Sequence, residues 1–154
     1  ICNSVCVSPC GKYIVSGSWD NTVRVWSLED GALVRTLEGH TDTCWSVCVS
    51  PCGKYIVSGS DDKTVRVWSL GDGALVRTLQ GHTEICYSVC VSPCGKFIVS
   101  GSSDNTVRVW NLEDGALMRT LQGHTDTCYS VCVSPCGKYI VSCSCDHTVV
   151  LWGP

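Results

Sequence analysis

Histidine, serine and aspartate recur three times in a fixed order along the chain, and these are the residue types that could do chemistry. In hydrolases of the Ser-His-Asp type, histidine takes the proton of the serine nucleophile while aspartate orients the histidine ring. Hydrolysis is therefore the first chemistry to consider. The three sets are His40, Ser58 and Asp62; His82, Ser100 and Asp104; and His124, Ser142 and Asp146.

Two features of the sequence count against a hydrolytic site. A catalytic triad is a singular arrangement with an exposed serine beside an oxyanion hole, whereas here the set returns with every repeat of the chain. The serines also lack the G-x-S-x-G turn that exposes the nucleophile of α/β-hydrolases. Ser58, for example, lies in the β-branched run at 55–60, which is typical of a strand. We therefore expect no catalytic residue and no enzyme activity.

Fourteen cysteines form the second group of reactive residues. Three recur in each repeat, as at Cys44, Cys48 and Cys52, and only Cys143 and Cys145 are additional. The first two of each trio lie in a predicted strand, where a gap of four residues spans roughly 13 Å, so they cannot both approach one zinc ion to about 2.3 Å. We expect small buried hydrophobic cysteines in a reducing compartment, cytoplasmic or alternatively nuclear, and no metal site. Disulfides between repeats, or a metal bound by several repeats, are the alternatives.

The chain is a tandem array in which a unit of about 42 residues recurs nearly four times. Each unit contains a Ser-Pro-Cys-Gly turn and ends a Thr-Val-x-x-Trp run with tryptophan. In the first complete copy we predict strands at about 45–50, 55–60, 64–69 and 75–80, separated by turns rich in Gly, Asp and Pro. Such closely spaced strands form an antiparallel meander sheet. We expect one domain, 1–154, with repeats at about 1–38, 39–80, 81–122 and 123–154.

The units resemble the WD-repeat family of β-propellers over the whole chain. The resemblance rests on the closing tryptophan and on a Gly-His pair, seen first at Gly39-His40 and again in the next two units. The aspartate that usually follows the tryptophan is replaced, for example by Ser69, at a position that varies widely in the family. The resemblance implies an all-β propeller of four-stranded antiparallel blades with about fifteen strands. It also implies that each unit gives its last strand to one blade and its first three to the next.

Four units are few for this family, whose propellers most often have seven blades within a range of about four to eight. No Gly-His precedes the first unit, and the sequence ends soon after Trp152, so we expect the fourth blade to lack its outermost strand. We expect a partial ring that is continued by other blades of a longer chain. The alternative is a homodimer that completes an eight-bladed ring.

Within this resemblance the His-Ser-Asp sets acquire a structural role. The family pattern implies that histidine bonds the turn aspartate and the strand serine, and that serine reaches the indole N–H of the closing tryptophan. A buried polar chain with all donors matched penalises slips in strand register. The first unit has Ser16, Asp20 and Trp26 but no histidine, so its network should be incomplete. The expected structural network comprises the three sets named above together with Trp68, Trp110 and Trp152.

The few positions at which the repeats differ are concentrated around the turn aspartate and at the start of the first strand. In the family's geometry both regions open on the top face, around the central channel. Rigid aromatic rings with charged neighbours are typical of interface hot spots, so we expect partner binding there. The alternative is neutral drift in loops, with the rings packed between blades. The expected partner-binding residues are Trp19, Trp45, Asp61, Lys63, Tyr87, Ser103 and Tyr129.

Charge and composition narrow the expected partners. The net charge is −3, acids and bases are interspersed along the chain, and no basic stripe is present to follow a phosphate backbone, so we expect no nucleic acid. No apolar run is long enough to span a membrane. We expect a non-enzymatic scaffold without cofactor that recognises a protein or peptide, as part of a larger multidomain signalling or sensor protein. A structural spacer without ligand is the alternative, and a metal-binding or hydrolytic protein is a more distant one.

Overall fold

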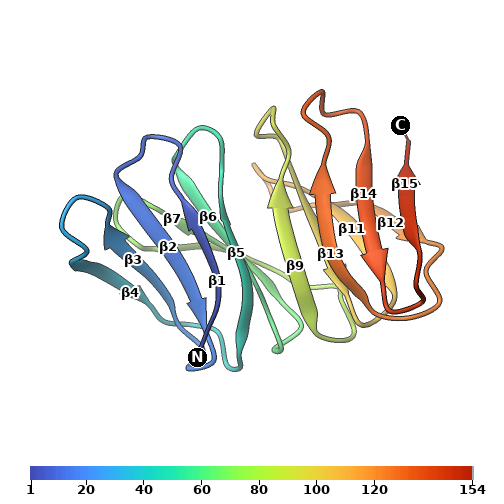
Figure 1. Ribbon diagram of the computed structural model, residues 1–154, viewed down its shortest axis with the longest axis horizontal. Helices are drawn as coiled ribbons and strands as arrows, with labels where there is room; N and C mark the ends of the chain where they lie inside the picture. Colours follow the sequence, from blue (N-terminus) through green and yellow to red (C-terminus); the bar gives the residue numbers. More distant parts are fainter. Residues whose placement is uncertain (154) are drawn as a thin grey trace.

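The computed structural model describes residues 1–153, which form fifteen β-strands in four sheets. The sheets stack like the blades of an open fan, with the first blade at one end and the last at the other (Figure 1). Within this range there is no helix long and apolar enough to cross a membrane.

Each blade is an antiparallel meander in which every strand pairs with the next one along the chain. The strands are, in blade 1, β1 (Cys2–Val7), β2 (Tyr13–Ser18), β3 (Val23–Ser27) and β4 (Leu33–Leu37); in blade 2, β5 (Cys44–Val49), β6 (Tyr55–Ser60), β7 (Val65–Ser69) and β8 (Leu75–Leu79); in blade 3, β9 (Cys86–Val91), β10 (Phe97–Ser102), β11 (Thr106–Asn111) and β12 (Leu117–Gln122); and in blade 4, β13 (Cys128–Val133), β14 (Ile140–Ser144) and β15 (Val149–Trp152).

The Ser-Pro-Cys-Gly segment closes the hairpin between the first two strands of each blade. In blade 2, Pro51 supplies the fixed φ that suits such a turn, and Gly53 has a φ of 70°, in the left-handed region that glycine adopts without strain. The backbone N–H of Gly53 donates to the Ser50 carbonyl over 2.8 Å. The Ser50 hydroxyl accepts a bond from the backbone N–H of Tyr55 at 3.0 Å. These local bonds set the register of the strands that follow.

Apolar side chains from facing sheets form the core between neighbouring blades. Between blades 1 and 2, Val15, Val23 and Val25 pack against Ile56 and Trp68, and none of these residues is more than 1% exposed. Equivalent residues form the cores between the following blades. Burying one side chain of this size contributes about 1.5–3 kcal/mol, so a blade depends on its neighbours for stability.

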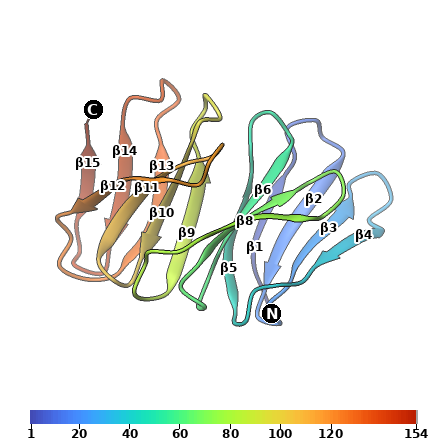
Figure 2. The ribbon, with the colours of Figure 1, turned by 180° about the vertical axis from the view of Figure 1, so that it is seen from behind.

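The first strands of the blades lie side by side on the inner side of the fan. Strand β5 contacts β1 and β9, and β9 contacts β13. These strands lie in the middle of Figure 1, with the outer strands β4 and β12 toward its two sides, and β8 is seen from behind in Figure 2. The hydroxyl of Ser4 accepts a bond from the backbone N–H of Val47 at 3.2 Å, and Ser46 does the same for Val89 at 3.1 Å. The starts of the inner strands are thus fixed relative to one another.

Within residues 1–153, the predicted all-β blades and the fifteen strands are confirmed, and the fourth blade has three strands, as expected. The strand predicted at 55–60 matches β6, and the other three differ from the structure by one residue at one or both ends. The expected division of each unit between two blades is wrong for the repeats at 39–80 and 81–122. All four strands of each of these repeats form a single sheet.

The fourteen cysteines all have free thiols, but their surroundings differ. Cys44, Cys86 and Cys128 are fully buried between blades, and burial raises the pKa of the Cys44 thiol to about 12. The expectation of a buried hydrophobic role is wrong for the seven exposed cysteines, four of which are the third cysteines of the repeats and lie in hairpin turns at the surface. The seven exposed cysteines are Cys2, Cys10, Cys52, Cys94, Cys132, Cys136 and Cys145.

The turn between the second and third strands tests how local backbone conformation contributes to stability. Asn21, Lys63, Asn105 and His147 all have φ between 66° and 70°. Asparagine tolerates this region better than lysine. We expect Lys63→Asn to raise the free energy of unfolding by about 0.5–1 kcal/mol and Asn105→Lys to lower it by a similar amount. Midpoints of urea unfolding check both, and unchanged midpoints would contradict the expectation.

Candidate functional site

A chain of hydrogen bonds links the loop before each inner strand to the centre of the blade. In blade 2, the Nδ1 atom of His40 lies 2.7 Å from Asp62 Oδ2, and Nε2 lies 2.7 Å from the hydroxyl of Ser58. The indole N–H of Trp68 donates to the same hydroxyl over 2.9 Å. The equivalent bonds in blades 3 and 4 are 2.7 to 2.9 Å long.

The bonding capacity of the four groups fixes the direction of this chain. An indole N–H can only donate, and a carboxylate can only accept. Trp68 therefore donates to Ser58, and the hydroxyl hydrogen of Ser58 is used within this chain only if it is donated to Nε2 of His40. The Nδ1–H of His40 then donates to Asp62. A neutral histidine with its proton on Nδ1 satisfies every group in the chain.

Ser58 has the hydrogen-bond distances of a triad serine but no access for a substrate. The side chain is 0% exposed, and its oxygen already accepts the bond from Trp68. The corresponding serines in blades 3 and 4, Ser100 and Ser142, are at most 1% exposed. A substrate carbonyl could reach these hydroxyls only if the blades separated. The arrangement therefore stabilises the fold rather than positioning a nucleophile.

Asp62 stays ionised although it is largely buried. Burial by itself raises the pKa of this carboxyl, but hydrogen bonds from His40 and Thr64 outweigh that effect and hold the pKa well below its usual range. The backbone N–H of Thr41 also donates to Oδ2 over 3.1 Å, and the Thr64 hydroxyl donates to Oδ1 over 2.6 Å. One carboxylate thus joins the loop between two blades to the turn between β6 and β7.

In blade 1 the same residues form two separate contacts, because no histidine connects them. The indole N–H of Trp26 donates to Ser16 over 2.9 Å. Asp20 instead pairs with Arg24, whose Nη2 atom lies 2.7 Å away, and the Asp20 side chain is 45% exposed. The carboxylate therefore does not reach the centre of the blade.

A β-bulge opens the first strand of every blade. In blade 2, Cys44 pairs with Ser60 and Ser46 pairs with Gly59, which leaves Trp45 as the additional residue. A bulge bends the strand and re-aims the extra side chain, and bulges are common beside functional sites. The same register shift occurs in the other blades, and the four extra residues are Asn3, Trp45, Tyr87 and Tyr129.

Three of the bulge residues, Trp45, Tyr87 and Tyr129, form a continuous aromatic column across blades 2 to 4. The ring centroids of Trp45 and Tyr87 lie 5.4 Å apart and those of Tyr87 and Tyr129 lie 4.9 Å apart. Tilted aromatic pairs at these distances each contribute about 0.5–1.5 kcal/mol beyond their burial. Tyr129 is 49% exposed, and the other two rings are partly exposed. The column therefore combines a fixed geometry with accessible aromatic surface.

The other predicted binding residues take different positions on the top face. Asp61 joins the aromatic column, because its Oδ1 atom accepts the indole N–H of Trp45 at 2.5 Å. Lys63 Nζ lies 3.6 Å from the Glu84 carboxylate in the loop that enters blade 3. Ser103 occupies the position in blade 3 that corresponds to Asp61. Trp19, at this position in blade 1, is 57% exposed and takes no part in the column.

Four residues beside the column were not among the predicted ones. Asp42, Glu84 and Asp126 are exposed acids in the loops that lead into the inner strands. The sequence indicates these acids by their regular position, two residues after the histidine of every Gly-His pair. Cys145 lies beside Tyr129 and raises the pKa of the Tyr129 hydroxyl. Only the fold places this thiol next to the column.

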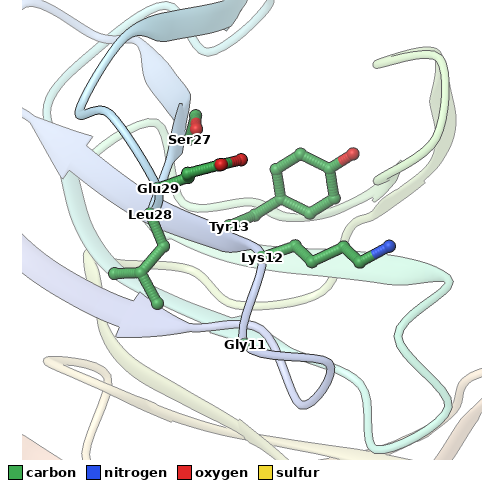
Figure 3. Close-up of a pocket in the computed structure, with 6 residues that line it drawn as sticks. All are labelled: Gly11, Lys12, Tyr13, Ser27, Leu28 and Glu29. Atoms are coloured by element: carbon green, nitrogen blue, oxygen red, sulfur yellow. The ribbon is translucent and has the colours of Figure 1, made fainter.

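A shallow groove lies at the opposite end of the blades, beside the hairpin turn. In blade 1 it has a volume of about 510 Å³, and Figure 3 shows the side chains of Lys12, Tyr13 and Glu29 extending to one side of the strand. The corresponding groove between blades 2 and 3, of about 520 Å³, is lined by Lys54 and Glu113 among others. One lysine and one glutamate line the first groove, whereas two lysines, Lys54 and Lys96, face one glutamate in the second.

Comparison with known families gives a match to nearly the whole chain. The family described as WD domain, G-beta repeat (WD40) matches residues 1–27, 31–69, 73–111 and 115–153. The chain belongs to the WD40 repeat family. A WD40 unit such as 31–69 begins with β4 of blade 1 and continues with the first three strands of blade 2. Strand sharing is therefore present when the family's own boundaries are used.

Three relatives match this chain over 35 to 40 residues, about the length of one WD40 unit. The chain is 52% identical over 40 residues to F-box/WD repeat-containing protein 7 of Drosophila melanogaster, which covers 26% of this chain and 3% of that protein. It is 54% identical over 35 residues to the ribosome biogenesis protein BOP1 homolog of Drosophila grimshawi, or 23% of this chain and 4% of that protein. It is 43% identical over 37 residues to the general transcriptional corepressor TUP1 of Saccharomyces cerevisiae, which covers 24% of this chain and 5% of that protein. The names of these relatives describe different cellular processes.

The hydrogen-bond chain predicts that Ser58 contributes more to the free energy of unfolding than Ser16, the equivalent serine of blade 1. Ser58→Ala removes the bonds to His40 and Trp68 and leaves two buried polar groups without a partner, so we expect it to lower the free energy of unfolding by about 2–4 kcal/mol. Ser16→Ala removes only the bond to Trp26, and we expect a loss of about 1 kcal/mol. Urea unfolding followed by tryptophan fluorescence measures both. Equal losses for the two variants would show that the histidine bond adds nothing.

Proposed function

We propose that this WD40 chain is a non-enzymatic scaffold that recognises a protein or peptide through its top face. The aromatic column carries the proposal. Its residues are among the few that vary between otherwise closely similar repeats, and each of them is the extra residue of a bulge in an inner strand. Membership of the WD40 family supports the general role, because its domains generally act in protein interaction.

The rigidity of the column favours binding. Rings that are already packed against one another lose little conformational entropy when a partner covers them, and such aromatic groups are enriched in interface hot spots. The Trp45 indole is further fixed by its bond to Asp61. The top face therefore offers a preorganised apolar surface with polar groups beside it.

The wider setting belongs to the same proposal. We propose that the chain works in a reducing compartment, the cytoplasm, where cysteines remain as thiols. A multidomain signalling or sensor protein is a setting in which such a scaffold would be useful. The main competing function, a structural spacer, requires no ligand and would leave the top face without a role.

Selected peptides test the binding role. Peptides selected by phage display against the intact chain should lose at least about 30-fold in affinity when Trp45 and Tyr87 are both replaced by alanine, because hot-spot residues contribute about 2 kcal/mol or more. Leu75→Ala is the matched control, since Leu75 is 44% exposed on the outer strand β8. Isothermal titration calorimetry measures the affinities.

The loss of peptide affinity in the Trp45→Ala, Tyr87→Ala variant reports on binding only if that variant stays folded. We expect its free energy of unfolding to stay within about 1 kcal/mol of the parent chain. If the double variant unfolds, the two rings belong to the core, and Tyr129→Ala then carries the test because Tyr129 is 49% exposed. A structural spacer is indicated if no selected peptide distinguishes the column variants from Leu75→Ala.

A second proposal concerns the two faces that no blade of this chain covers. Val5 on blade 1 is 65% exposed, whereas Val47 at the same position in blade 2 is 5% exposed. Val149 on blade 4 is 71% exposed, whereas its counterpart Val65 is 0% exposed. At each junction between blades, the face that corresponds to the Val149 face of one blade packs against the face that corresponds to the Val5 face of the next blade. The two open faces are therefore complementary to one another. We propose that a further WD40 blade covers each of them.

In a solution of the 154-residue chain, a second copy is the available source of that blade. We therefore expect light scattering to give a dimer, or larger species if the contact does not close a ring. Val5→Lys or Val149→Lys should shift the mass to that of a monomer. Val76→Lys, on the outer strand β8, should leave the mass unchanged. A monomer at every concentration would contradict self-association.

A further inference from the structure

Charge is unevenly divided between the two ends of the blades. The top face comprises the turns and loops at 19–22, 38–43, 61–64, 80–85, 103–106, 122–127 and 145–148. It carries nine of the fourteen carboxylates, against Lys63 and the guanidinium groups of Arg24, Arg66 and Arg108, which reach it from the third strands. Five negative charges are therefore uncompensated there. The rest of the chain holds five carboxylates and seven lysine or arginine side chains.

The uncompensated acids surround the aromatic column. Asp42 and Asp126 are exposed in the loops that lead into β5 and β13. Asp61 is in direct contact with the column through its hydrogen bond to Trp45. The Oδ1 atom of Asp61 accepts the Trp45 indole, while Oδ2 has no hydrogen-bond partner among residues 1–153. Lys63 is the single lysine of the top face, and it already lies beside Glu84. Asp42, Asp61 and Asp126 are thus the carboxylates that a ligand can reach, whereas Asp62, Asp104 and Asp146 are engaged in the buried network.

The two tyrosines of the column respond to this surrounding charge. Burial raises the pKa of Tyr87, and the neighbouring Tyr129 and the Asp61 carboxylate raise it further. The pKa of Tyr129 is raised by Cys145 and also by the Asp126 carboxylate. Both hydroxyls therefore stay protonated and neutral at physiological pH. The centre of the top face is an electronegative surface made of aromatic rings and carboxylates.

We infer that the ligand of the top face is a cationic peptide segment, which places a lysine or arginine side chain against the aromatic column beside Asp61. This inference rests on the proposed function and specifies its partner. A cation is attracted by the faces of aromatic rings as well as by carboxylates, so both features of the site favour the same ligand. Excess negative charge also attracts a basic segment over a distance and increases its association rate.

An acidic or phosphorylated segment is the opposite choice, and the charges disfavour it. Recognition of such a segment uses clusters of arginine, whereas the arginines of the top face are directed to the turn aspartates and the Gly-His loops. The grooves at the other end of the blades contain both lysine and glutamate. The top face is therefore the surface with one dominant charge beside an aromatic site.

A series of labelled peptides tests the inference on the intact chain. Four versions of one twelve-residue glycine-serine peptide are made, which contain four arginines, four lysines, four glutamines or four glutamates. Their binding is measured by fluorescence anisotropy at low and at physiological salt. We expect the arginine and lysine peptides to bind at least about tenfold more tightly than the glutamine peptide, with a smaller difference at higher salt. Binding of the glutamate peptide should be weakest.

Matched variants connect that preference to the column. We expect Asp61→Asn, which keeps an acceptor for the Trp45 indole, to weaken the arginine peptide about fivefold, and Tyr87→Leu to weaken it about two- to fivefold. Glu29→Gln removes one negative charge at the other end of the blades and should change the affinity less than about twofold. Equal effects of Asp61→Asn and Glu29→Gln would overturn the inference, because binding would then depend only on net charge.

The remaining outcomes separate this inference from the proposed function. If peptides from the display selection bind the column but carry no cationic residue, or if the glutamine or glutamate peptide binds best, the cationic ligand is wrong and the scaffold stands. If neither the display peptides nor the charge series binds the top face, both proposals fall.

Discussion

The hydrogen bonds from tryptophan through serine and histidine to aspartate are the constraint on which the rest of this structure depends. Apolar packing between blades is strong but tolerant of sliding, because successive valines along a strand are similar in shape. The bonds between Trp68, Ser58 and His40 are directional, and they are satisfied in a single register. Asp62 extends the chain to the turn between β6 and β7 and to the loop that enters blade 2 from blade 1. Each blade is therefore positioned by a few buried polar contacts.

That constraint separates the constant part of the WD40 unit from the part that can vary. Residues in the network and in the cores between blades are repeated almost without change, whereas the bulge position holds Asn3, Trp45, Tyr87 or Tyr129. A bulged residue makes no ladder bond, so its side chain can change without loss of strand pairing. The fold thus provides a rigid support with one freely variable site in each blade, which suits recognition.

The same geometry sorts the charges. Nine of the fourteen acids lie in the turns and loops at the top of the blades, and four lysines, among them Lys12 and Lys54, follow the hairpin turns at the other end, where Glu29 and the other four acids also lie. Each unit therefore adds acids to one end of the blades and a lysine to the other. Stacking the blades adds these contributions together, so a chain with a net charge of only −3 has an electronegative top face. Repetition also aligns the three aromatic rings into one column.

The sequence by itself determined the blades, because turn residues and β-branched runs act locally. Pro51 and Gly53 define a hairpin, and the repeat spacing implies that every unit does the same. It also indicated which residues form the network, through a family resemblance. Only the tertiary structure decided that Trp45 is bulged, that Cys145 lies beside Tyr129, and that nine of the fourteen acids gather at one end of the blades. These features depend on strand register and on contacts between units, and residues distant along the chain become neighbours only when the blades stack.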